Sequence, residues 1–300
     1  MKGMREIRNR IKAIKSTGQI THAMELVASS KMKRAQQNAE AGHPYAALLM
    51  DITDMAAECV AKGGRMDASR YFSNPNCGRR LIIVISTDKG LCGPLNSNLF
   101  KKISELGDEC DFIAVGKRAE RFLARSGRSV VNAMRISDKV EFSETRRIAK
   151  FASKLAAEGK VGSIEVLYSM YINTLKQEPT LVKLAPVDNL DWFIDRMRKM
   201  YKLKTEPRPE ESRRINFEPS AAEIFSKLPA YYFTQALHQL ALDAKASEQS
   251  ARRVAMKAAS DNADALVDSL TLDYNKARQA AITTEIQELA AAAAVSDEQL

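Results

Sequence analysis

AYYFTQALHQLALDAKASEQSARRVAMKAASDNADALVDSL, residues 230–270, lies in a C-terminal stretch, Ala230–Leu300, that contains no glycine and no proline. An α-helix rises 1.5 Å per residue, so the chain from Pro229 to about Ala290 would form a helix on the order of 90 Å long. A compact domain of this size cannot enclose such a helix. We therefore expect the C-terminal helix to project.

The predicted start of this helix is well marked. Pro219 precedes Ser220-Ala-Ala-Glu223, in which Ser220 would cap the helix and Glu223 would complete a capping box. Pro229 then either kinks this helix or begins a second one as its first residue. Residues 280–295 are apolar on every side, which is typical of a helix that other protein surrounds.

The N-terminal stretch is predicted to be the partner of this helix. From Met4 to Ala41 only Gly18 interrupts a helix-compatible sequence, and the helical pattern continues past Pro44 to Lys62. A stripe of mostly small or apolar residues recurs there at alternating steps of four and three, at Ile7, Ile11, Ile14, Gly18, Thr21, Glu25, Ala28, Met32, Ala35 and Ala39. The C-terminal helix repeats this spacing at Leu237, Leu240, Ala244, Ser247, Ala251, Val254 and Ala258, and then, shifted by one residue, at Ala259, Ala263, Leu266 and Leu270.

Alternating steps of four and three are the spacing of a heptad repeat, so the two helices should wind around each other with a left hand. Their ends carry opposite charge. Residues 1–40 hold nine Lys or Arg against three Glu, whereas residues 258–300 hold eight Asp or Glu against Lys276 and Arg278. Because the helices flank one intervening domain, we predict an antiparallel pair. The alternative, two independent surface helices, fits their uninterrupted length poorly.

Residues 75–215 are predicted to form a small α/β domain. Leu81–Ser86 is a continuous apolar, β-branched run, as expected of a strand that is covered on both faces. Further predicted strands and helices alternate after it, which is typical of a doubly wound sheet. Asn189–Asn216 is charged and contains prolines, and we interpret it as a loop insertion. The fold class is thus a long antiparallel, left-handed coiled coil with a central α/β domain. Its expected parts are residues 1–62, 75–215 and 220–295.

No catalytic constellation is apparent. The loop Thr87-Asp-Lys-Gly-Leu-Cys-Gly-Pro-Leu-Asn96 follows the first strand but contains neither of the common phosphate-binding glycine patterns. The only histidines, His22, His43 and His238, have no cysteine or carboxylate at metal-ligand spacing. We therefore expect no cofactor, no metal and no small-molecule substrate. The four cysteines, Cys59, Cys77, Cys92 and Cys110, lie far apart and are expected to be reduced.

The net charge of +9 leaves a second interpretation open, a basic coiled-coil protein that binds nucleic acid or acts as a scaffold. No apolar run approaches the roughly 18 residues that a membrane span needs. The charged start of the chain has no apolar signal core behind it, so we expect the chain to stay on the cytoplasmic side of any membrane.

Three motifs resemble the gamma subunits of rotary F-type ATP synthases of the bacterial type. The first is the opening helix, with Arg5–Lys15 and Gln19–Arg34. The second is Ile85-Ser-Thr-Asp-Lys-Gly-Leu-Cys-Gly93 with Asn96-Ser-Asn98. The third, highly specific, consists of Ala255-Met-Lys-Ala-Ala-Ser-Asp-Asn-Ala263 and Tyr274–Ile286. The motifs stand at the start, middle and end, so the resemblance spans the chain.

The resemblance implies a non-catalytic rotor at the centre of a proton-translocating complex that makes ATP. Its coiled coil would stand inside a ring of alpha and beta subunits. Its domain would couple to the membrane ring of c subunits beside the epsilon subunit, which implies a peripheral place at the cytoplasmic face of the cell (inner) membrane. The basic N-terminal third would then meet acidic levers of the beta subunits, and no nucleic acid.

The resemblance also assigns contacts to individual positions. Those implied to touch the alpha/beta ring are Met24, Lys31, Arg34, Cys92, Gly93, Arg252, Gln279, Thr283 and Glu285, and those implied to form the foot on the c-ring and epsilon are Phe217 and Glu218. The chain departs from the family pattern at Pro94, at Arg253 and in residues 189–216. These departures bear on the lever and foot contacts, and leave the fold unaffected.

Overall fold

The structure is a computed structural model that describes residues 2–42, 44–45, 47–49, 51–52, 55, 77–186 and 217–297. The chain divides into two units. One consists of residues 1–28 and 252–300, and the other of residues 29–251. The predicted charged loop at 189–216 lies outside the described residues, as do most residues between 53 and 76.

The two predicted long helices are present. Helix α1 spans Lys2–Ala41 and helix α7 spans Ala221–Asp297, which makes α7 77 residues long. The Ser220 hydroxyl accepts a hydrogen bond from the Glu223 amide at 3.2 Å, as the capping pattern predicts. Helix α7 continues through Pro229, so no second helix begins there.

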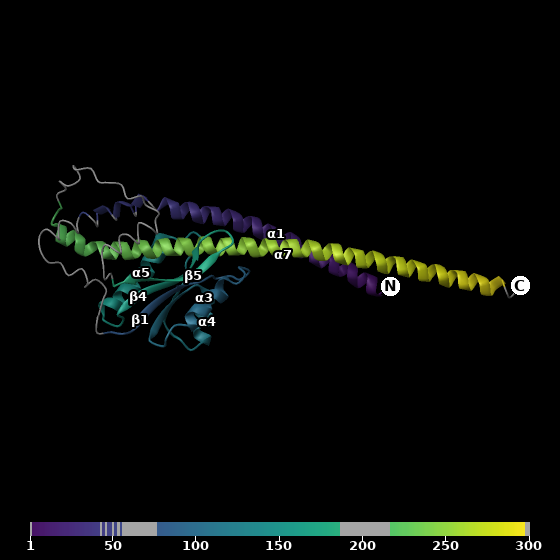
Figure 1. The fold of residues 1–300 in the computed structure, drawn as a ribbon, viewed down its shortest axis with the longest axis horizontal. Coiled ribbons are helices and arrows are strands. Elements are labelled where there is room, and N and C mark those ends of the chain that lie inside the picture. Colours follow the sequence, from purple (N-terminus) through teal and green to yellow (C-terminus); the bar gives the residue numbers. More distant parts are fainter. Residues whose placement is uncertain are drawn as a thin grey trace. The chain divides into compact units, whose positions relative to one another are not determined.

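The predicted stripe on α1 is the buried face of that helix. Its members from Ile7 to Ala39 are buried or half-buried, and most residues between them are exposed. In the unit formed by the two ends of the chain, a Cβ on Gly18 would lie 3.3 Å from Ala263 Cβ, so only glycine permits this close approach without a shift. In the other unit, a Cβ on Gly42 would lie 3.4 Å from Gln239 Oε1. The helices therefore pack on each other through small residues, and they run antiparallel (Figure 1). Their handedness stays a prediction.

Two predicted members of the α7 stripe are wrong. Ala258 is exposed, whereas its neighbour Ala259 is half-buried. Leu266 is 53% exposed, whereas its neighbour Val267 is half-buried. Leu270, the predicted end of the stripe, is half-buried, so the stripe ends where predicted and only the order of its steps after Ala263 differs, four then three in place of three then four.

The α/β domain contains a five-stranded sheet in the order β3-β2-β1-β4-β5. The strands are β1 (Arg80–Ile85), β2 (Cys110–Val115), β3 (Ser129–Met134), β4 (Ser163–Tyr171) and β5 (Gln177–Ala185), and the helices between them are α3 (Leu95–Ser104), α4 (Lys117–Arg125) and α5 (Phe142–Ala157). Strands β1 to β4 are parallel, and β5 pairs with β4 in antiparallel orientation. The predicted strand Leu81–Ser86 corresponds to β1, one residue earlier at each end, and the predicted alternation of strands and helices follows it.

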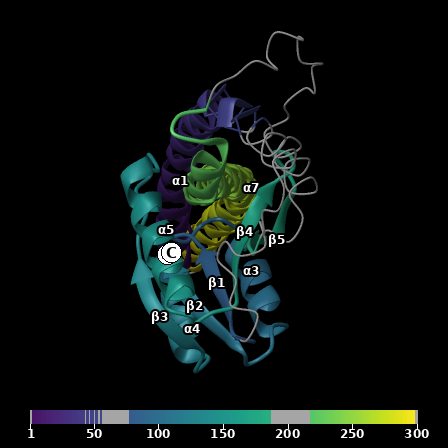
Figure 2. The same ribbon diagram turned by 90° about the vertical axis from the view of Figure 1, so that its left-hand side faces the viewer.

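Both faces of the sheet are covered, as the continuous apolar strand β1 predicts. Leu81, Ile83 and Ile85 belong to a core shared with α5 and the first part of α7. Ile82 and Val84 point to the opposite core, which α3 and α4 cover. Figure 2 shows the green part of α7 between α1 and the strands β4 and β5. Helix α7 is therefore one of the layers of the domain and also one of the two long helices.

Candidate functional site

The sheet contains the position at which open α/β folds ordinarily bind a ligand. This is the crevice beyond the carboxyl ends of two parallel strands, at the point where the strand order reverses. Here the reversal lies between β1 and β4. A cavity of about 30 Å³ at this point is lined by residues that include Thr87, Asn96, Ser169, Lys245 and Glu248. Such a volume holds one or two water molecules, whereas ligand pockets span roughly 300–1,000 Å³.

Helix α7 occupies the space that a ligand would need. Its residues Ala241, Ala244, Lys245 and Glu248 line the cavity, opposite the loop that follows β1. The crevice at the end of the sheet, which holds nucleotides in other proteins, is here filled by a helix.

The loop after β1 is closed by its own hydrogen bonds. Asn96 Nδ2 donates to Thr87 Oγ1 at 2.8 Å and to Cys92 Sγ at 3.2 Å. Thr87 Oγ1 donates to the Lys89 carbonyl at 2.6 Å. Cys92 is only 2% exposed. Its thiol is therefore a structural part of the loop, and any contact with another chain must come from the loop's exposed residues.

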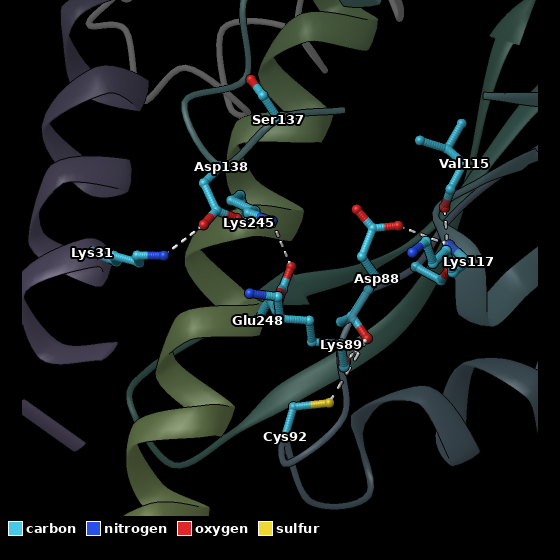
Figure 3. Close-up of polar contacts among 12 residues, drawn as sticks. Lys31, Asp88, Lys89, Cys92, Val115, Lys117, Ser137, Asp138, Lys245 and Glu248 are labelled. Atoms are coloured by element: carbon cyan, nitrogen blue, oxygen red, sulfur yellow. Dashed lines mark hydrogen bonds and ion pairs between the residues drawn. The ribbon is translucent and has the colours of Figure 1, made fainter. Parts of the chain in front are cut away.

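Ion pairs tie the domain to both long helices (Figure 3). Asp138, in the turn between β3 and α5, accepts a hydrogen bond from Lys31 on α1 at 2.5 Å, and its other oxygen lies 2.8 Å from Lys245 Nζ on α7. Lys245 also donates to Glu248 at 2.9 Å. We call Lys31, Asp138, Lys245 and Glu248 the Asp138 bridge. No sequence motif pointed to it, although Lys245 and Glu248 form a charged pair inside an otherwise apolar and small stretch of α7.

Asp138 and Lys245 hold their charges over a wide pH range. Hydrogen bonds from Lys245 and then Lys31 hold the pKa of Asp138 well below its usual range. Burial alone would lower the pKa of Lys245, but Glu248 and Asp138 outweigh it and raise that pKa. Both partners are therefore ionised at neutral pH.

His238 joins α7 to the start of α5. Its Nδ1 lies 3.2 Å from Thr145 Oγ1, and its ring meets the Phe142 ring edge-on at a centroid distance of 5.3 Å. The Thr145 hydroxyl donates to the Phe142 carbonyl at 3.0 Å, so we assign the proton to His238 Nδ1, which donates to Thr145. Burial lowers the pKa of His238 below its ordinary value of 6.5.

This burial predicts an acid-sensitive packing of α7 on α5. Above pH 6.5 the imidazole is neutral in the folded and unfolded chain, so the full stability is present. As the pH falls below 6.5, the unfolded chain binds a proton that the folded chain resists, and the free energy of unfolding decreases. We expect His238→Gln to flatten the dependence of the melting temperature on pH between about pH 7 and about pH 5. The control is His22→Gln, because the His22 side chain is 62% exposed. Equal flattening in both variants would contradict this assignment.

The predicted contact residues on α1 and in the β1 loop differ in accessibility. Lys31 and Arg34 are exposed and Met24 is half-buried. Lys31 belongs to the Asp138 bridge, so a contact with another chain would share or replace that ion pair. In the loop, Gly93 is exposed at a φ of 56° while Cys92 is buried. Leu91, which the sequence motifs did not single out, is 59% exposed beside them.

The predicted contact residues on α7 and in the foot also fall into two groups. Gln279, Thr283 and Glu285 are exposed on the last part of the helix, together with Ile282 and Ile286 at 48% and 61% exposure. Arg252 is buried at 9% exposure. Phe217 packs against the domain core, and Glu218 beside it is exposed.

Within the described part of the chain, no group of three or more His, Cys, Asp or Glu is placed to hold a metal ion. Among the helices described, none is long and apolar enough to cross a membrane. Cys77, Cys92 and Cys110 are free thiols, and Cys59 lies outside the described residues.

Comparison with known proteins gives a consistent result over nearly the whole chain. A family model described as "ATP synthase" matches residues 3–295. The chain is 42% identical over 294 residues to the "ATP synthase gamma chain" of Opitutus terrae, covering 97% of this chain and 98% of that one. It is 37% identical to the protein of the same name from Methylacidiphilum infernorum, covering 96% and 97% of the two chains.

Solved structures share the fold. A chain in the rotor of the Euglena gracilis mitochondrial ATP synthase matches with a TM-score of 0.61 at 17% identity, covering 93% of this chain and 99% of that one. A chain in the central stalk and c-ring structure of the Tetrahymena thermophila mitochondrial ATP synthase matches with a TM-score of 0.57 at 22% identity, covering 80% and 99%.

Proposed function

This chain belongs to the family of ATP synthase gamma chains, and on that premise we propose that its paired helices carry the rotation of a membrane ring into the catalytic ring. The chain is the central-stalk rotor subunit of ATP synthase, a non-catalytic part of a complex for ATP synthesis and proton transport. Its part in coupling therefore depends on the contacts that it makes with the other subunits.

The observation that carries the proposal is the pairing of α7 with α1. Within the unit formed by the chain ends, Gly18 and Ala263 bring the two helices into close approach. A shaft without threefold symmetry must contact chemically identical catalytic sites differently. A contact with the shaft shifts the conformational equilibrium of a catalytic site only if the contact energy differs between the conformations of that site. The size of the shift equals that difference in energy. A stiff helix pair that carries both charged and small side chains is suited to make such different contacts.

We assign the alpha and beta subunits to two regions of this shaft. Gln279, Thr283 and Glu285, exposed on the last part of α7, would contact the surrounding ring. Arg252 is only 9% exposed, so it would reach the ring through the small exposed part of its side chain. Met24, Lys31 and Arg34 on α1 would contact the acidic levers of the beta subunits. The loop after β1 would join them through Gly93 and the exposed side chain of Leu91.

We assign the epsilon subunit and the c-ring to the domain and the foot. Glu218 is exposed, whereas Phe217 is anchored in the core, so the foot would touch its partner mainly through Glu218. The chain would then sit at the cytoplasmic face of the cell membrane as a peripheral subunit. The Tetrahymena structure supports the c-ring as a partner, because it comprises a central stalk together with a c-ring.

Affinity purification of the tagged chain from detergent-solubilised membranes tests these assignments. Mass spectrometry of the eluate should find the alpha, beta, epsilon and c subunits together with the chain. Recovery of the chain without them would contradict the partner assignments. Tight binding to DNA that weakens steeply with salt would instead support the nucleic-acid interpretation of its basic charge.

A further inference from the structure

The turn between β3 and α5 presents Asp138 from a rigid support. The Glu144 carboxylate accepts hydrogen bonds from the Ser137 amide at 3.1 Å, the Ser137 hydroxyl at 2.9 Å and the Glu141 amide at 3.0 Å. Val140, at 4% exposure, is anchored in the core that α5 and α7 share. The turn is therefore held at both sides of Asp138, so a force on the domain reaches this carboxylate with little local yielding.

The two arms of the Asp138 bridge differ in burial. The side chains of Lys245 and Glu248 are 12% and 8% exposed, whereas those of Lys31 and Asp138 are 43% and 51% exposed. Solvent screens the arm that reaches α1 more than the arm that reaches α7. The bridge thus holds α7 firmly and α1 more weakly.

Helix α7 has further polar ties to the domain. Asp243 accepts a hydrogen bond from the Tyr171 amide at 3.3 Å, and the Ser250 hydroxyl donates to the Thr174 carbonyl at 2.9 Å. With His238 and Lys245, these contacts hold α7 to the domain at several points. Among the described residues, the polar tie from α1 to the domain is the arm from Lys31 to Asp138.

Among the described residues of this unit, the contact between α1 and α7 contains few polar interactions. Met32 and Ala35 are buried on α1, and Ser247 Oγ and Gln239 Oε1 are buried on α7 without a hydrogen-bond partner among the described residues. The hydrophobic effect is non-directional and roughly proportional to the buried area, so contacts between small residues fix the position of one helix along the other only weakly. A load applied to the domain would therefore move α7 ahead of α1 unless another contact couples them.

We propose that Asp138 is a positioning residue for torque transfer, which holds α1 and α7 to the domain at one point so that both helices turn with it. The inference rests on the rotor function. It gives Lys31 an intramolecular role in addition to any contact with another subunit. Asp138 acts through the two lysines, Lys31 and Lys245.

The first test uses hydrogen exchange on the purified full-length chain. Asp138→Asn removes the charge but keeps the size, and we expect amide exchange in residues 29–41 of α1 to accelerate about threefold, as for loss of one partly exposed ion pair. Asp138→Glu should restore slow exchange. Asp108→Asn is the matched control, because Asp108 is a fully exposed carboxylate of the same domain paired with Arg128. Unchanged exchange in Asp138→Asn would overturn the proposal.

The second test uses the whole ATP synthase in inverted membrane vesicles. Asp138→Asn should lower proton pumping per ATP hydrolysed while the complex assembles normally, and Asp138→Glu should recover it. A purely structural role would reduce the amount of complex and leave this ratio unchanged, which would overturn the proposal. Should Asp138→Asn fail to assemble, the exchange test still decides. If the wild-type chain does not purify with the complex, the rotor assignments fail. If it does, and Asp138→Asn couples normally, only this inference fails.

Discussion

Arg252→Glu is expected to reduce ATP-driven proton pumping to below about one tenth of wild type, whereas Lys12→Glu should leave most of it. Both substitutions change the net charge equally, and both residues lie on the long helices. Arg252 is 9% exposed and Lys12 is exposed. Reversing a buried charge costs on the order of 3–5 kcal/mol, whereas an exposed one contributes less than about 1 kcal/mol.

The pumping assay needs two accompanying measurements. Co-purification of the alpha and beta subunits shows whether the complex assembles. Arg252→Lys keeps the charge but loses the planar fork that binds an acceptor through two hydrogen bonds. Intermediate pumping in Arg252→Lys, with normal assembly, would support the assigned contact with the ring. Equal losses in Arg252→Glu and Lys12→Glu would show that this assignment does not hold for the chain.

Gly116→Ala is expected to destabilise the α/β domain far more than Gly127→Ala. Gly116 stands between β2 and α4 with φ 95° and ψ 149°, a conformation that is almost confined to glycine. A Cβ there would lie 2.5 Å from the Ser86 carbonyl oxygen, at the end of β1. Gly127 also has a positive φ, of 67°, but a Cβ there meets nothing within 4 Å.

We expect Gly116→Ala to cost about 3 kcal/mol or more and Gly127→Ala about 1 kcal/mol. For a domain of this size, each 1 kcal/mol lowers the melting temperature by roughly 2–4 °C. Thermal unfolding of the full-length chain, followed by near-ultraviolet circular dichroism, measures both variants. Similar losses would mean that the backbone near Ser86 yields easily, contrary to its close packing against Gly116.

Local sequence patterns predicted most of the fold. The stretch without breakers after Pro229 predicted α7, and steps of four and three on α1 predicted its buried face, including Gly18 and Ala28. The continuous apolar run of β1 predicted a strand between two covered faces. Helical period, strand alternation and breakers act over a few residues, so they can be recognised without any partner.

The candidate site was predicted less completely. The resemblance indicated Gln279, Thr283 and Glu285, and all of them are exposed in the structure. It also indicated Cys92 and Arg252, whose burial became visible only once the chain was folded. A motif identifies a position, but the exposed fraction of its side chain depends on what packs over it.

Local patterns thus suffice to predict the long helices, the strands between them and the small residues where the two helices meet. Tertiary structure alone decided that α7 fills the crevice at the end of β1, and that Asp138 meets Lys31 and Lys245. Lys31 and Asp138 lie 107 positions apart in the chain. No short-range pattern links such residues, because their contact depends on the sheet order and on the way both helices lie against it. The periodicity of the sequence therefore reveals the two long helices, whereas the contact between these helices and the domain arises only from packing.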